Sequence, residues 1–364
     1  MLKKTLSLSL LIATFLGAFA QKDTAAHVVA PPPIAITGSV DGYYRYNFSG
    51  ATNNYTSFTN SQNSFELGMA SIRGDHSFGK SAVTVDLGFG RRAAEYSYND
   101  TSSKNNLFAL KQMYFTYQLC SKVKLTAGKW GTHVGYEVLD AYSNRNYSMD
   151  YMFSFGPFFH TGIKADVTID SNWAYMVGVA NPTDFSSTTS PTKVLLGQFS
   201  HTTKDGKWKE FLNYQGYYGV STPYFLNPGT SYYLAKSMTQ LDFVLNGTLS
   251  SKWGLGLNGT YQTLETDKSH NWYGAALYLN YDPTPKFGYT LRSEYFSDAD
   301  GIKIPLGGNV VDFTLSGNWK IDNCLTFMPE IRLDNASKDG VFAKSDGSST
   351  KSTFTALIAA VYKF

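Results

Sequence analysis

The stretch FHTGIKADVTID (residues 159–170) decides the fold, because apolar and polar side chains alternate along its whole length. A period of two predicts a β-strand with one apolar face and one polar face. The same alternation is plain in residues 82–90, 289–296, 311–320 and 352–364. Strands of this kind are typical of a sheet that separates an apolar surrounding from water.

Sixteen segments with this alternation follow one another after residue 33. They lie near residues 34–48, 63–77, 82–98, 107–118, 123–135, 157–170, 172–181, 192–203, 209–222, 236–249, 253–266, 271–282, 287–297, 309–321, 324–336 and 352–364. Two of the segments depart from the simple pattern. The phase of one slips near Ala70, which predicts a β-bulge. Another contains Pro329, at a point where a paired strand would need an N–H group.

The connections between these segments alternate in length. Seven are short, near residues 78–80, 119–122, 170–172, 204–207, 250–252, 282–286 and 322–323. Eight are longer, near residues 49–62, 99–106, 136–156, 182–191, 223–235, 267–270, 298–308 and 337–351. Outer-membrane barrels have short periplasmic turns and long extracellular loops. The alternation therefore predicts an all-β fold: a transmembrane antiparallel β-barrel of about 16 strands, spanning residues 34–364.

The composition fits such a barrel better than a soluble domain. Charged residues make up 16% of the 364 residues, below the usual quarter, and aromatic residues make up another 16%. Aromatic side chains gather where the segments end, as in the interfacial girdles of membrane barrels. Past residue 20 no apolar run is long enough for a transmembrane helix, so a membrane location requires a barrel. A secreted β-sandwich or propeller is the soluble alternative.

The N-terminus has the pattern of a secretory signal. Lys3 and Lys4 precede a short apolar stretch that ends at the A-x-A sequence Ala18-Phe19-Ala20. We expect residues 1–20 to be a signal peptide and residues 21–33 to be a periplasmic linker; an uncleaved anchor is the alternative. Removal of the two lysines takes the formal charge from +3 to +1. A near-neutral chain argues against a nucleic-acid partner.

The chain ends on Phe364, which closes an alternating strand. Outer-membrane barrels resemble one another in a terminal aromatic residue that the barrel-assembly machinery reads. The resemblance implies that this machinery is a partner, through the C-terminal strand. It also implies a location in the outer membrane of a Gram-negative bacterium, with lipid and lipopolysaccharide around the barrel. Whether the protein is a monomer or a homo-oligomer stays open.

One block of the sequence resembles a known family. Residues 127–165 read AGKWGTHVGYEVLDAYSNRNYSMDYMFSFGPFFHTGIKA. Gly135-Tyr136-Glu137, Asp140-Ala141, residues 144–148, Gly156-Pro157-Phe158 and His160-Thr161-Gly162 make this block similar to the β-barrel porin-2 family of Gram-negative outer-membrane proteins. The resemblance implies a channel role without naming a solute. Elsewhere in the chain it is a likeness of architecture only.

The middle of this block, residues 136–156, is the third long loop. In general porins the third loop folds into the barrel and narrows the pore. Here the loop carries the candidate constriction residues Glu137, Asp140, Arg145 and Asp150. Its many aromatic residues favour burial, which indicates a loop inside the lumen rather than over the barrel mouth. We expect its carboxylates to face basic residues of the wall, with Arg92 as the leading candidate.

Charged residues also occupy the polar phase of the predicted strands. The candidate pore-wall residues are Asp86, Arg92, Lys164, Asp166, Arg292, Glu294, Asp312, Glu330 and Arg332, with Asp242 and Lys320 in the same phase. Inward charges are costly in a closed core but ordinary in a water-filled lumen, so they favour an open channel. Internal salt bridges in a plugged lumen are the alternative. The phases of Arg73 and Lys129 are ambiguous.

These features predict an outer-membrane porin for passive diffusion of small hydrophilic solutes or ions. No enzyme activity, metal or cofactor is expected, because no G-x-S-x-G elbow or complete calcium loop is found. The two cysteines, Cys120 and Cys324, are expected to be unpaired. The alternative is a barrel with a plugged lumen that acts as a hydrolase or as a surface-binding protein.

Overall fold

The structure is a computed structural model that describes residues 31–52, 55–100, 106–227, 231–304 and 306–364. The side chains of residues 220–234 lie outside this description. The chain divides into two units, residues 1–33 and 34–364. The predicted signal peptide, and the linker as far as residue 30, lie outside the described residues. Within the described part, no helix is long and apolar enough to cross a membrane.

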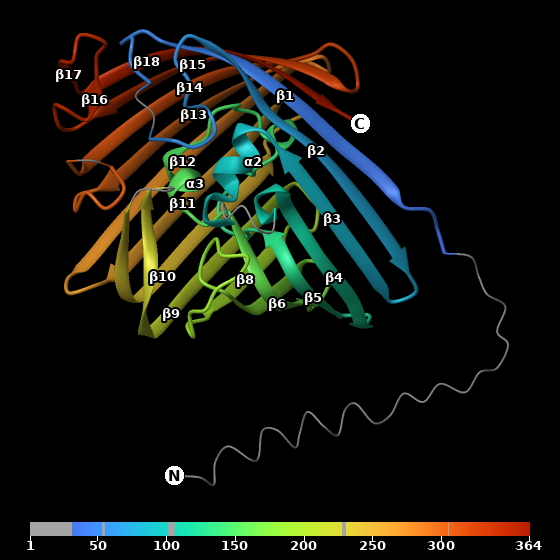
Figure 1. Cartoon of the computed structure of the whole chain (residues 1–364). Helices are drawn as coiled ribbons and strands as arrows, with labels where there is room; N and C mark the ends of the chain where they lie inside the picture. The colour runs from blue at the N-terminus through green and yellow to red at the C-terminus, as the bar shows by residue number, and fades with distance from the viewer. Residues whose placement is uncertain (1–30, 53–54, 101–105, 228–230, 305) are drawn as a thin grey trace, which may run out of the picture. The chain divides into compact units, whose positions relative to one another are not determined.

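Sixteen antiparallel strands close into a barrel in which sequence neighbours pair throughout and the first strand pairs with the last (Figure 1). This confirms the predicted fold. The barrel strands are β1 (Ala35–Asn47), β2 (Ser64–Phe78), β3 (Ser81–Phe89), β4 (Leu110–Cys120), β5 (Val123–Gly131), β6 (Phe159–Thr168), β7 (Trp173–Ala180), β8 (Val194–Thr202), β9 (Trp208–Asn227), β10 (Ser231–Thr248), β11 (Trp253–Glu265), β12 (Ser269–Thr284), β13 (Phe287–Asp298), β14 (Gly308–Lys320), β15 (Leu325–Ala336) and β18 (Ser352–Lys363).

The connections define two ends of the barrel. The turn end carries the seven short connections. The loop end carries the other eight connections, numbered in chain order. Those discussed below are L1 (48–63), L2 (90–109), L3 (132–158), L4 (181–193), L7 (299–307) and L8 (337–351). The described short elements are α2 (Arg91–Tyr96), η1 (Tyr98–Asp100) and η2 (Leu107–Ala109) in L2, η3 (Ala141–Ser143) and α3 (Tyr151–Phe155) in L3, and the hairpin of β16 (Phe342–Ala343) and β17 (Ser349–Thr350) in L8. We expect the turn end to face the periplasm.

Two predicted boundaries are wrong. The segment 82–98 does not continue as a strand, because β3 ends at Phe89 and the chain turns at Gly90 into α2. Gly90 has a φ of 115°, and a side chain there would come within 2.6 Å of the carbonyl oxygen of Gly68, so only glycine suits this turn. The predicted loop 223–235 is mostly strand, since β9 and β10 extend to Asn227 and Ser231.

Both departures from simple alternation have a structural counterpart. The register between β1 and β2 shifts at Gly68, two residues before Ala70, and makes the expected bulge. Around Pro329 the β14–β15 ladder is interrupted between the pairs Ser316–Glu330 and Trp319–Phe327. The missing N–H of the proline therefore falls in a gap of the ladder, where no partner needs it.

Apolar side chains cover the outside of the barrel. Ile163 and Leu315 are 54% and 42% exposed, as expected for lipid-facing residues in the absence of lipid. Next to Ile163 in the chain, Lys164 is on the opposite, inner face and pairs with Asp166. Cys120 and Cys324 are unpaired, as predicted.

Replacing Ile163 by Arg is expected to lower the free energy of unfolding by about 2–4 kcal/mol, because a charge would enter the middle of the lipid-facing surface. Gln198→Arg is the matched control, at the middle of β8 on its partly exposed inner face. There the new guanidinium can stay hydrated, so the loss should be much smaller. Equilibrium unfolding of both variants in lipid vesicles measures the difference. Equal losses would show that the phase of the strands is misassigned.

Candidate functional site

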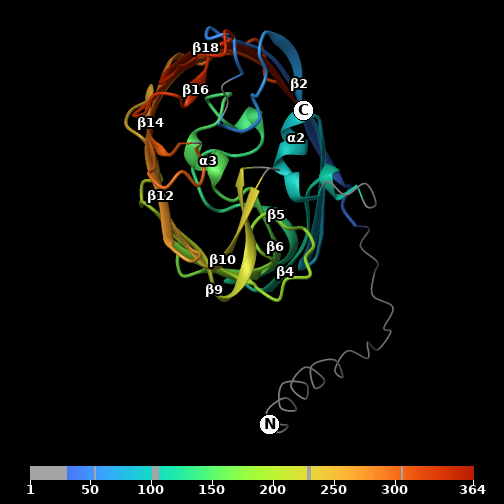
Figure 2. The same cartoon turned by 60° about the vertical axis from the view of Figure 1, so that its left-hand side comes forward.

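Loop L3 lies inside the barrel. Figure 2, which looks into the barrel, shows α3 and α2 within the ring of strands. The predicted loop 136–156 therefore enters the lumen. Near the start of L3, Gly135, with a φ of 93°, donates its N–H to Asp242 Oδ1 over 3.0 Å. From there the loop crosses toward β13, β14 and β15.

Carboxylates of the barrel wall accept the backbone N–H groups of L3. These groups would otherwise be buried without a partner, which is costly. The contacts are Glu330 with the N–H groups of Tyr147 and Ser148 (2.8 and 3.2 Å), and Glu294 with those of Tyr151 and Met152 (2.8 and 2.9 Å). Glu294 thereby satisfies the first two N–H groups of α3, and Asp150 caps the helix by accepting from Phe153 N over 2.6 Å.

Arginines hold the backbone carbonyls of the same loop. Arg292 donates to Ser148 O (2.7 Å), and Arg332 donates to Met149 O (2.6 Å). Both arginines also pair with carboxylates of the wall: Arg292 with Asp312 (2.8 Å), and Arg332 with Asp334 (2.7 Å). The charged side chains of β13 to β15 are therefore buried under L3 and hold its backbone in place. On this side of the lumen the inward charges form internal salt bridges, which was the alternative to a water-filled lumen in the sequence analysis.

Glu137 and Asp150 meet at the centre of this contact. Glu137 Oε1 lies 2.7 Å from Arg292 Nη1, and Glu137 Oε2 accepts the N–H of Asp150 over 2.8 Å. Tyr278 donates its hydroxyl to Asp150 Oδ2 over 2.7 Å. Burial, together with the neighbouring Asp150, raises the pKa of Glu137 to about 8, against the opposing effect of Arg292. Both carboxylates serve to anchor the loop.

The other two predicted constriction residues lie nearer the turn end. Arg145 pairs with Asp282 over 2.7 Å and donates to Thr290 Oγ1. Asp140 pairs with Lys111 over 2.6 Å, and Lys111 also lies 3.2 Å from Asp86. The side chain of Asp140 is 18% exposed and that of Asp86 is 3% exposed, so Asp140 is the more accessible of the two carboxylates that pair with Lys111.

The expected pairing of the L3 carboxylates with Arg92 is wrong. Arg92 is not a wall residue, because the strand ends before it and places it on α2 inside the barrel. Its guanidinium donates to the carbonyl oxygens of Leu139 and Tyr147 over 3.1 and 3.2 Å, between the rings of Phe58 and Tyr147. The partners of Glu137 and Asp140 are Arg292 and Lys111 instead.

The remaining predicted wall residues all face inward. Asp86, Arg292, Glu294, Asp312, Glu330 and Arg332 are buried, whereas Lys164 and Asp166 are partly exposed. The two ambiguous residues also point inward: Arg73 pairs with Asp75 over 2.7 Å, and Lys129 pairs with Asp100 over 3.0 Å. Any role of these residues in solute passage remains a prediction.

Lys111 was missed by the sequence analysis because it sits in a bulge. The β3–β4 register passes from the pair Asp86–Gln112 to the pair Leu87–Leu110, so Lys111 is the extra residue of β4. The bulge turns its side chain into the lumen although the alternation assigns the inner face to its neighbours. No local sequence signal marks this shift.

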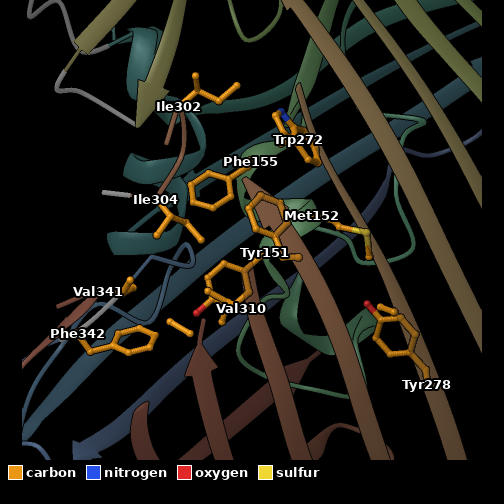
Figure 3. Close-up of a cluster of buried hydrophobic side chains, with 13 residues drawn as sticks. Tyr151, Met152, Phe155, Trp272, Tyr278, Ile302, Ile304, Val310, Val341 and Phe342 are labelled. Carbon is orange, nitrogen blue, oxygen red and sulfur yellow. The ribbon is translucent and has the colours of Figure 1, made fainter. Parts of the chain in front are cut away.

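Toward the loop end an apolar cluster seals L3 against the strands and outer loops. Figure 3 shows Tyr151, Met152 and Phe155 of L3 packed among residues of the wall, L7 and L8. The other members drawn there include Trp272 and Val310 from the wall, Ile302 and Ile304 from L7, and Val341 and Phe342 from L8. Burial of these large side chains stabilises the inward position of the loop.

Loop L4 holds the other end of L3 through Asp184. Its Oδ1 accepts the N–H groups of Phe158 and Phe159 over 2.7 and 2.9 Å, and its Oδ2 accepts the hydroxyl of Tyr98 over 3.0 Å. Burial raises the pKa of Asp184 to about 6, although these hydrogen bonds oppose the shift. Asp184 thus joins L2, L3 and L4.

The attachment of L4 is expected to weaken as pH rises. The pKa of Asp184 lies above its ordinary value of 3.8, so its contribution is complete below that value and is lost as pH rises through about 6. The difference of about 2 units corresponds to about 3 kcal/mol. Hydrogen exchange of residues 181–193 at pH 4 and pH 7 measures the loss. Asp184→Asn keeps an oxygen acceptor without a charge and should remove this dependence; the same pH profile in both proteins would refute the assignment.

Cavities remain where L3 leaves the wall uncovered. One of about 310 Å³ lies between L3 and strands β4 and β5, lined by Gln112, Gly131, Thr132 and Leu139 among others. Another, of about 440 Å³, opens near the turn end beside Arg73 and Phe364. Among the described residues, no group of three or more His, Cys, Asp or Glu side chains could hold a metal ion.

A closed sixteen-strand barrel with its third long loop inside the lumen is the architecture of a porin-type outer-membrane protein. Residues 33–364 match the family model described as Putative beta-barrel porin-2, OmpL-like, and the chain belongs to this family. Its location is therefore the outer membrane of a Gram-negative bacterium. No relative was found among the curated proteins.

Solved porin structures share the fold at low sequence identity. The anion-selective porin from Comamonas acidovorans is similar with a TM-score of 0.61 and 10% identity, over 91% of this chain and 99% of that one. Pseudomonas putida OprB gives 0.59 and 13%, over 91% and 94%. OmpT of Vibrio cholerae gives 0.57 and 12%, over 91% and 97%. These likenesses support the barrel fold and leave the solute open.

Proposed function

We propose that the protein is a porin through which small hydrophilic solutes or ions diffuse along the side of the lumen that L3 leaves uncovered. The observation that carries the proposal is the uneven contact of L3 with the wall. Its hydrogen bonds to charged wall residues reach β1, β4, β10, β12, β13 and β15, whereas the inner faces of β6 and β8 keep polar, partly exposed side chains. Lys164, Asp166 and Gln198 are of this kind.

Family membership and fold support the same proposal. Barrels of sixteen strands are wide enough to leave an aqueous channel. L3 fills part of that width and would set the size limit for solutes. Polar groups on the part of the wall that L3 leaves uncovered would replace some of the water molecules that hydrate a solute during its passage, as the selectivity regions of pores do.

Cysteine modification tests the route. In a background without Cys120 and Cys324, Gln198→Cys places a thiol on the inner face of β8, and Leu195→Cys places one on its outer face, where Leu195 is 54% exposed. A water-soluble, charged thiol reagent should lower the conductance of Gln198→Cys in planar bilayers and leave that of Leu195→Cys unchanged. Absence of channel steps from the refolded protein would refute the porin proposal. Equal responses of the two variants would refute the route.

We further propose that the chain is not an enzyme. A barrel hydrolase would need a histidine paired with a serine. His160 Nε2 lies 3.3 Å from Thr132 Oγ1, and His201 Nδ1 lies 3.3 Å from Glu210 Oε2. These contacts give neither histidine a serine partner, and they do not favour hydrolysis. The surface-binding alternative has no specific observation in its favour.

Lipid, lipopolysaccharide and the barrel-assembly machinery are the partners that we propose for the barrel itself. The exposed apolar outer face supports a lipid partner. Phe364 supports recognition by the assembly machinery, because it is 56% exposed at the turn end, while its backbone is held by Gly38 over 3.0 Å in both directions. A homo-oligomer stays a prediction.

A further inference from the structure

Lys111 bridges the barrel wall and the loop inside it. Its ammonium lies 3.2 Å from Asp86 on β3 and 2.6 Å from Asp140 on L3. The lysine and Asp86 side chains are each only 3% exposed, whereas that of Asp140 is 18% exposed. One cation therefore links two carboxylates that belong to different parts of the fold. It does so at an edge of L3 that borders the cavity of about 310 Å³.

The same lysine separates two cavities. It lines the cavity of about 310 Å³ between L3 and strands β4 and β5, and it also lines the cavity of about 440 Å³ near the turn end. Asp140 lines the first cavity and Asp86 lines the second. The ion-paired group Asp86–Lys111–Asp140 thus stands where a solute would leave one cavity and enter the other.

We infer that Lys111 is a tethered cation that gates this passage in favour of small cations, such as an alkali metal ion or a primary ammonium group. The inference rests on the proposed porin function. The gate has two carboxylates against one ammonium, so its formal charge is −1. An entering cation can take the place of the lysine ammonium between Asp86 and Asp140 when the long, flexible side chain moves aside.

An anion finds no equivalent place at this gate. An anion that displaced the Lys111 ammonium would face two carboxylates, which repel it. An anion that did not displace the ammonium would find the passage occupied by the lysine side chain. Like charges across a narrow gap exclude ions of that sign. The other charged residues that line the two cavities are Glu137, which pairs with Arg292, Arg73, which pairs with Asp75, and Lys363, whose ammonium lies 5.9 Å from the centre of the Tyr142 ring. Lys111 is the charged residue that lines both cavities, so the selectivity of the passage between them depends on the gate.

Single-channel recording with a salt gradient tests the inference on the full mature chain. Lys111→Met should raise the conductance and increase the permeability of K⁺ over Cl⁻ severalfold, because both carboxylates lose their built-in cation. Lys111→Arg should behave like the unmodified protein. Lys164→Met is the matched control: Lys164 also faces the lumen and pairs with an aspartate, at 3.1 Å, but lines neither cavity.

The outcomes separate this inference from the porin proposal. Conducting channels whose conductance and selectivity are the same in Lys111→Met as in the unmodified protein would overturn the gate alone. Absence of channels from every variant would overturn the porin proposal and the gate with it. Should Lys111→Met fail to fold, Asp140→Asn replaces it. This variant leaves one carboxylate facing Lys111 and should shift selectivity toward Cl⁻; an unchanged reversal potential would equally overturn the gate.

Discussion

Replacing Arg292 by Met is expected to destabilise the docked third loop by about 3–5 kcal/mol. The guanidinium of Arg292 is fully buried and pairs with both Glu137 and Asp312, at 2.7 and 2.8 Å. It also donates to the carbonyl oxygens of Ser148 and Met149. Its removal leaves the buried carboxylate of Glu137 without its cation and Ser148 O without a donor, whereas Asp312 and Met149 O keep Arg332, at 3.5 and 2.6 Å. Limited proteolysis of L3 and equilibrium unfolding in detergent measure the effect.

Arg73→Met is the matched control for this change. Arg73 also pairs with a neighbouring carboxylate over 2.7 Å, but the two side chains are 33% and 38% exposed. Solvent screening should reduce the value of that pair to about 1 kcal/mol or less. The double variant Arg292→Met with Glu137→Gln should recover part of the loss, because one buried charge then disappears. Equal stabilities of the two single variants would contradict the anchoring role of Arg292.

The barrel was predictable from the sequence because its signals are local. Alternation with a period of two, short turns and long loops each depend on a few neighbouring residues. The inward position of L3 was also predictable, from the aromatic residues of residues 136–156 and from the place of this loop after the fifth strand. Where a local conformation competed, prediction failed: the strand 82–98 gives way at Gly90 to the short helix α2.

The pairing inside the lumen was not predictable. Glu137 and Arg292 are far apart in the sequence, as are Arg145 and Asp282, and only closure of the barrel brings them together. Phase alone shows that a charge points inward, but it does not show whether water or a loop covers the charge. Lys111 was missed for a further reason, since a single bulge residue changes the face of a strand without a mark in the sequence.

Deleting residues 140–152 is expected to raise the channel conductance severalfold, because the central part of the loop inside the lumen disappears. The wall should tolerate the loss. Arg292 keeps its pair with Asp312, and Arg332 keeps its pair with Asp334, at 2.8 and 2.7 Å. Water can then hydrate the carboxylates that had accepted L3 backbone groups. Single-channel recording of the refolded deletion variant measures the change.

The deletion should also favour cations. At the middle of β13 to β15, two arginines, Arg292 and Arg332, would face water together with four carboxylates, those of Glu294, Asp312, Glu330 and Asp334. Their formal sum is −2, which attracts cations into the widened lumen. Deletion of residues 344–348, the exposed tip of L8, is the control and should leave conductance unchanged. A folded 140–152 deletion with unmodified conductance would show that L3 does not limit the pore, and the barrel assignment would stand.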